Sequence, residues 1–129
     1  MRNRIAKRFV ILVILVVISL ISSPVLAQTY AFVLDKEIVH VYWEEDGTLS
    51  LAYEFVFSNA NYADPIDFID VGMPNSSYST SRASASVNGV PITHIAESPY
   101  VTNGIELGLG SNAIQPGETG TVRFSMTGI

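Results

Sequence analysis

Residues 38–57 read IVHVYWEEDGTLSLAYEFVF, and this stretch decides the fold. From Leu49 to Phe57, leucine or an aromatic residue stands at every second position, with Ser, Ala, Glu and Val between them. A period of two is typical of a β-strand with one apolar face. The residues before the EEDG turn are also rich in β-branched and aromatic side chains. The stretch therefore predicts a long β-hairpin around one tight turn.

The length of the turn sets the register of this hairpin. A two-residue loop would put Tyr42 opposite Leu51 and turn Trp43 away from the apolar face. A three-residue loop sets Trp43 opposite Leu49 and brings every apolar residue of that face to one side. Because a slip of one residue turns a whole strand over, burial favours the three-residue loop. That loop needs a type I turn followed by Gly47 in the left-handed region. The same register pairs Val41 with Leu51 and Val39 with Tyr53, and puts His40 on the side of Ser50, Ala52 and Glu54.

Residues 1–27 have the three parts of a Sec signal peptide. Four basic residues come first, residues 9–21 are almost all apolar, and Val25 and Ala27 are small side chains before a cleavage point. The alternative is an uncleaved N-terminal membrane anchor, although the apolar run is shorter than the ~20 residues of a spanning helix. We expect export through the Sec pathway and a mature protein that begins at Gln28.

Without residues 1–27 the chain is strongly acidic. Lys36, Arg82 and Arg123 stand against twelve acidic residues, which gives a net charge of −9. Such a charge repels phosphate backbones and anionic lipids, so it argues against a nucleic-acid partner and against electrostatic docking on a membrane. The simplest role of the acidity is to keep an exported protein soluble.

The sequence contains no cysteine. Catalysis by a thiol, thiolate metal sites and disulfide bonds are therefore excluded. Stability must come from packing, in which we expect Trp43 and the Phe and Tyr side chains to be important.

After the hairpin, short strand patterns alternate with turn signals such as Asn88-Gly89 and the Pro-Gly-Glu of residues 116–118. Residues 30–34 are interpreted as an edge strand or as the beginning of the first hairpin strand. Further strands are expected at residues 68–73, 82–87, 90–95, 105–109 and 119–127. About seven or eight strands at this spacing predict an all-β fold, an antiparallel immunoglobulin-like β-sandwich formed by residues 28–129.

The chain ends two residues after the last predicted strand. We expect residues 28–129 to be the N-terminal module of a longer protein, or a truncated gene product. Anchoring to a membrane through residues beyond 129 would then be an alternative to an uncleaved N-terminal segment.

Several motifs carry a family resemblance: PIDFIDVGMPN at residues 65–75, VNGVPI at 87–92, SPYV at 98–101 and IQPGETGTV at 114–122. With the hairpin, they make the chain resemble the N-terminal region of uncharacterised bacterial secreted or membrane-anchored proteins. The resemblance covers nearly all of residues 28–129. It implies a β-sandwich and a larger parent protein, and it implies no activity and no site residues.

Three carboxylates follow one another at three-residue spacing: Asp64, Asp67 and Asp70. They lie close in sequence to Asn59 and Asn61, and calcium prefers oxygen ligands on loops of this kind. The spacing matches no EF-hand, and a strand from residue 68 would point two of the carboxylates to opposite sides. Turn formation and strand capping are the simpler interpretation, so no metal or other cofactor is assigned.

No catalytic motif is present. Glu54 and His40 are the closest approach to an acid–base pair, and the other histidine, His94, follows a separate turn. The sequence has neither a Gly-x-Ser-x-Gly elbow nor a His-Glu-x-x-His motif. We therefore expect no enzyme activity from this chain.

Two functions remain open. The first is a non-catalytic structural or interaction module outside the cytoplasmic membrane, which binds a protein or glycan partner or pairs through an exposed edge strand. The alternative is a calcium- or carbohydrate-binding accessory domain of a larger exported protein. Aromatic residues scattered along the chain could form a sugar- or peptide-binding surface, but they could equally be single exposed side chains or lie at the edge of the core. These residues are Tyr30, Phe32, Tyr42, Tyr62, Tyr78 and Tyr100.

Overall fold

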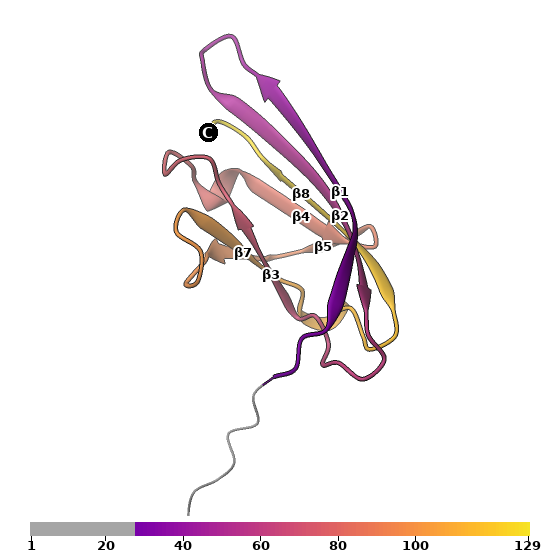
Figure 1. Ribbon diagram of the computed structural model, residues 1–129. Helices are drawn as coiled ribbons and strands as arrows, with labels where there is room; N and C mark the ends of the chain where they lie inside the picture. Colours follow the sequence, from indigo (N-terminus) through magenta and orange to yellow (C-terminus); the bar gives the residue numbers. More distant parts are fainter. Residues whose placement is uncertain (1–27) are drawn as a thin grey trace, which may run out of the picture.

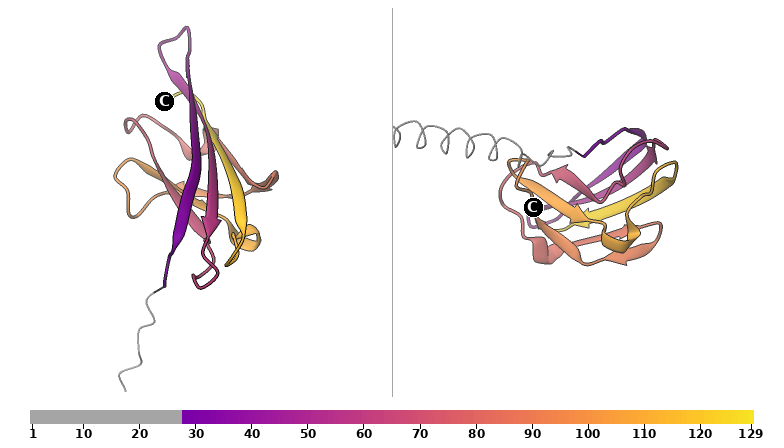
Figure 2. Two further views of the ribbon diagram at one scale, coloured as in Figure 1. Left: turned by 45° about the vertical axis from the view of Figure 1, so that its right-hand side comes forward. Right: turned by 90° about the horizontal axis from the view of Figure 1, so that it is seen from below.

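The computed structural model describes residues 28–129, which form eight strands in two antiparallel sheets. The predicted signal peptide, residues 1–27, lies outside the described residues. Figure 1 shows the arrangement of the strands, and Figure 2 shows it from two further directions. No helix among residues 28–129 is long and apolar enough to cross a membrane.

The larger sheet has five strands in the order β1-β2-β8-β4-β5. The central strands β2 and β8 are paired over most of their length and carry alternating inward residues, which explains their burial. The long β1–β2 hairpin rises beyond the other strands at the upper end of Figure 1. The strand bounds are β1 (Phe32–Trp43), β2 (Leu49–Asn59), β4 (Ala83–Val87), β5 (Val90–Ile92) and β8 (Thr119–Met126).

The smaller sheet has three strands in the order β3-β7-β6. Their bounds are β3 (Phe68–Gly72), β6 (His94–Glu97) and β7 (Gly104–Gly108). The apolar core lies between the two sheets, and its most completely buried side chains come from both of them. These are Val87, Ile105, Leu107, Leu109, Val122, Phe124 and Met126.

The predicted register of the first hairpin is confirmed. Trp43 pairs with Leu49, and the pairs Val41–Leu51, Val39–Tyr53 and His40–Ala52 follow from it. The Gly47 N–H donates to the Glu44 carbonyl at 3.0 Å, and Gly47 has φ +85°. The three-residue turn is therefore closed by a left-handed glycine, as the apolar pattern required.

The second predicted hairpin is also confirmed. Asn88 and Gly89 have φ +50° and +83°, and Val87 pairs with Val90 across them. Positive φ at both central residues is the signature of a two-residue hairpin turn.

Two predictions about the fold are wrong. Residues 90–95 form no single strand, because β5 belongs to the larger sheet and β6 to the smaller, with the chain crossing between them. Trp43 adds little to the packing, because 76% of its surface stays exposed at the protruding end of the hairpin. Of the two interpretations of residues 30–34, the second holds for residues 32–34, which begin β1.

Candidate functional site

The inner face of β1 is apolar and uncovered. Five hydrophobic side chains on this face are 41–76% exposed: Phe32, Leu34, Val39, Val41 and Trp43. Each pairs with an inward-facing residue of β2, so the register points them toward the side where the core lies. Exposed apolar patches of this kind mark sites of interaction with partners or ligands.

The face is uncovered because the smaller sheet stops at β3. β1 is an edge strand of the larger sheet and β3 is an edge strand of the smaller one. No further described strand of the smaller sheet lies opposite β1. The space between these two edges is here called the β1–β3 groove.

A bulge in β1 determines which side chains of this strand face the lower part of the groove. The pairing slips between Leu34 and Lys36, so Leu34 and Phe32 face inward together with Val39 farther along. Without the bulge, a strict period of two would put Val33 and Asp35 inward instead. This change of parity in the sequence was a signal for the bulge that our sequence reasoning missed.

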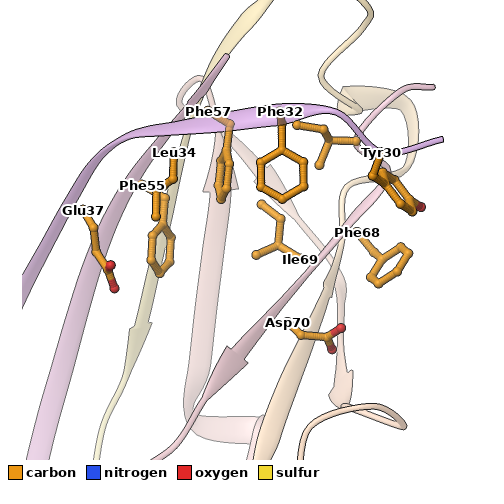
Figure 3. A pocket seen from close by; sticks show the side chains of 10 residues that line it. Tyr30, Phe32, Leu34, Glu37, Phe55, Phe57, Phe68, Ile69 and Asp70 are labelled. Carbon is orange, nitrogen blue, oxygen red and sulfur yellow. The ribbon is translucent and has the colours of Figure 1, made fainter. Parts of the chain in front are cut away.

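The lower part of the groove is a hollow of about 340 Å³. Side chains of β1 and β2 line one wall, and Phe68, Ile69 and Asp70 of β3 line the other (Figure 3). Phe32 and Phe57 meet edge to face there, with 5.6 Å between the ring centroids. The hollow is therefore mainly aromatic, with few polar groups.

The upper part of the groove is a second hollow of about 440 Å³. It lies between the hairpin and the end of β3, where Gly72, Met73 and Pro74 form one wall. Val39 and Val41 contribute the apolar surface of β1. The two hollows lie along the same inner face of β1, so the groove follows the direction of that strand.

Two carboxylates line the lower part of the groove, Glu37 from β1 and Asp70 from β3 (Figure 3). Glu37 pairs with the inward-facing Phe55. Its charge helps to raise the pKa of the Tyr53 hydroxyl, after the larger effect of that hydroxyl's own burial. Asp70 borders the groove at the edge of β3, but it pairs with Glu106, so its side chain stands on the outer face of the smaller sheet, where its buried Oδ1 accepts no hydrogen bond from any described residue.

An aromatic cluster forms the lower end of the groove. Phe68 packs edge to face with Tyr30 at 5.9 Å and stacks on Tyr100 at 6.0 Å. The Tyr30 hydroxyl donates to Asp67 Oδ1 at 2.9 Å. Burial, followed by this hydrogen bond, raises the pKa of Tyr30 to about 12. Tyr100 remains 75% exposed, so this cluster continues the apolar groove onto the surface.

The three calcium candidates are not gathered into a site. Asp64 accepts a hydrogen bond from the Thr29 N–H at 2.6 Å, and Asp67 accepts one from Tyr30. Asp70 lies on β3, opposite Glu106 of β7. Within residues 28–129, no three histidine, aspartate or glutamate side chains lie together in a way that could hold a metal ion. The first two carboxylates hold the segment that leads into β1, which is a structural role.

Asn59, which the sequence placed beside the calcium candidates, is a buried structural residue. Its Nδ2 donates to the carbonyl oxygens of Asp64 and Ile114 at 2.9 and 3.1 Å. The side chain therefore ties the end of β2 to two loops.

The acid–base pair considered from the sequence does not form. Glu54 accepts hydrogen bonds from Lys36 at 2.8 Å and from Arg123 at 2.8 and 3.0 Å. These two cations hold the pKa of Glu54 below its usual value. His40 instead stacks on the Tyr42 ring.

Sequence reasoning missed one histidine–carboxylate pair. His94 Nε2 lies 3.0 Å from Glu106 Oε1 on the smaller sheet. The two residues come together because β6 pairs with β7, which no local pattern reveals. The imidazole is largely exposed and lies on the outer side of the sheet, at 62% side-chain exposure.

The groove is suited to binding an extended, mainly apolar chain, and its two carboxylates provide the only charges among its lining residues.

No family model, no curated protein and no solved structure matches this chain.

Proposed function

We propose that this chain is a non-catalytic interaction module of an exported protein, with an immunoglobulin-like β-sandwich arrangement. A single observation carries the proposal, namely the row of apolar side chains left exposed along β1. An edge strand with an exposed apolar face is a liability for aggregation, so proteins usually cover or charge it. A binding function explains why this one stays open.

Sequence features support the location outside the cytoplasmic membrane. Residues 1–27 have the composition of a Sec signal peptide, and residues 28–129 carry a net charge of −9. A soluble acidic domain that exposes one apolar strand face fits a partner encountered after export.

Site-specific photo-crosslinking tests this function in cells that express the protein. A photoreactive amino acid at position 43 would lie on the inner face of β1, and one at position 42 on the outer face. Both positions are exposed, with Trp43 at 76% and Tyr42 at 53%, so position 42 is a matched control. We expect crosslinks to another protein from position 43 and few from position 42. Equal crosslinking, or none from position 43, would contradict the proposal.

Carbohydrate binding is a second candidate, favoured by the aromatic cluster at the lower end of the groove. Tyr100 stacks on Phe68 with an interplanar angle of 29° and is 75% exposed. Flat exposed rings are suited to the apolar face of a sugar. A glycan at about 100 times its dissociation constant would stabilise the protein by roughly 2.7 kcal/mol. The test is the melting temperature with a panel of soluble glycans, and a rise that Tyr100→Ala abolishes would favour this candidate.

A further inference from the structure

We propose that the β1–β3 groove takes an extended segment of a partner protein, which adds as a strand to the free edge of β3. Apolar side chains at alternate positions of that segment fill the groove, and a lysine or arginine among them reaches Glu37. This proposal rests on the proposed interaction function and specifies the chemistry of the partner.

The backbone of β3 is ready for an additional strand. The Leu109 N–H donates to the Asp67 carbonyl and the Met73 N–H to the Asn103 carbonyl, both at 2.7 Å. Because hydrogen-bonded residues alternate in an antiparallel pair, Ile69 and Val71 also direct their backbone groups to β7. The N–H and C=O groups of the even-numbered residues 68, 70 and 72 then point to the free edge. An extended chain can pair with those groups.

Other edges are better protected against such pairing. β5 contains Pro91, which lacks an N–H, and β1 is interrupted by the bulge at Asp35. β6 has only four residues and carries His94 and Glu97 at its ends. β3 has no proline, lysine or bulge, and it lies beside the groove. The strand addition is therefore assigned to β3.

The charge of the groove selects a basic partner. Glu37 stands on the inner face of β1 in its lower part, paired with the inward-facing Phe55. The basic side chains of residues 28–129 are engaged elsewhere: Lys36 and Arg123 on Glu54, and Arg82 on the Gly128 carbonyl. A cation supplied by the partner would pair with Glu37, whereas a purely apolar strand would cover that carboxylate without pairing it.

A second copy of the chain is a poorer occupant. Residues 28–129 carry a net charge of −9, so two copies repel each other before any groove contact forms. The expected partner is a different protein with an alternating apolar segment that carries a basic residue on its apolar side.

The test uses the purified protein with two synthetic nine-residue peptides, blocked at both ends. One has the sequence VTVTKTVTV and the other VTVTETVTV, so that they differ only in the charge placed on the apolar side. Trp43 is the only tryptophan of the chain and stands on the inner face of β1, so its fluorescence reports binding. Hydrogen exchange of the β3 amides shows where the peptide pairs.

We expect the lysine peptide to bind at least about fivefold more tightly than the glutamate peptide, as a partly exposed ion pair allows. Glu37→Lys should reverse this preference. Glu45→Lys makes the same change of charge in the exposed turn, and this variant should still prefer the lysine peptide. On binding, the amides of residues 68, 70 and 72 should gain protection from exchange.

Several results would overturn the proposal. They are no binding by either peptide, equal affinity for both, an unchanged preference in Glu37→Lys, or binding without protection of β3. A stable dimer that shields Trp43 without peptide would also overturn it, because a second copy would then occupy the groove. If Glu37→Lys does not fold, Glu37→Gln should abolish the preference rather than reverse it. Crosslinks from position 43 without peptide binding would leave the interaction function standing and remove strand addition alone.

Discussion

Gly47 closes the central hairpin in a backbone conformation that other residues resist. It has φ +85°, and nothing lies within 4 Å of the position that a Cβ atom would take. A side chain at this position therefore costs conformational energy without a steric clash.

Gly47→Val should lower the free energy of unfolding by about 1–2 kcal/mol, because a β-branched residue resists the left-handed region. Gly47→Asn is the matched control, since asparagine enters that region more readily. Urea unfolding of both variants gives the comparison. Equal losses in the two would mean that the turn is not held by the left-handed conformation.

Asn59 shows how an isolated residue can mislead. Beside three aspartates in the sequence it suggested a ligand, yet the residue is 5% exposed and its Nδ2 donates to two carbonyl oxygens. Removing a buried donor of this kind leaves its acceptors unsatisfied, which is why such residues are retained for structure. The types and spacing of residues 59–70 cannot distinguish this from calcium binding.

At the scale of the strands, a network of charges joins β1, β2 and β8 on the outer face of the larger sheet. Glu54 of β2 accepts hydrogen bonds from Lys36 of β1 and Arg123 of β8. Hydrogen bonds from Lys36 and then Arg123 are the largest causes of the lowered pKa of Glu54. A network that spans three strands favours their alignment.

This network predicts a dependence of stability on pH. The folded pKa of Glu54 lies below the usual 4.5, so its contribution is complete above 4.5 and is lost as the pH falls through the lower folded value. The difference in unfolding free energy between the native protein and Glu54→Gln should therefore shrink on acidification. Glu45→Gln, in the exposed turn, is the control and should show a smaller change. A difference that stays constant from well above to well below 4.5 would contradict this role.

The sequence predicts the pairing of some strands and not of others. The alternation in residues 49–57 and the two turn signals are local, and they gave the register of the β1–β2 hairpin and of the Asn88-Gly89 hairpin correctly. The assignment of residues 90–97 to two different sheets depends on pairing with distant strands. A local pattern contains no information about which sheet a short strand joins.

For the whole molecule, the same limit explains why the groove was not foreseen. The sequence predicts that β1 has an apolar face, and it predicts two-layer packing. Whether another strand covers that face depends on where the smaller sheet ends. That sheet ends at β3, which turns an expected part of the core into an exposed surface. Glu37 lies on the groove side because the hairpin register pairs it with the inward-facing Phe55.

Hydrogen exchange of the β3 amides in the free, dilute protein tests the open edge most directly. The account predicts alternation: fast exchange at Phe68, Asp70 and Gly72, whose N–H groups point to the free edge, and slow exchange at Ile69 and Val71, which pair with β7. Equal protection of all five amides would contradict it, because the edge of β3 would then already be covered in the absence of a partner.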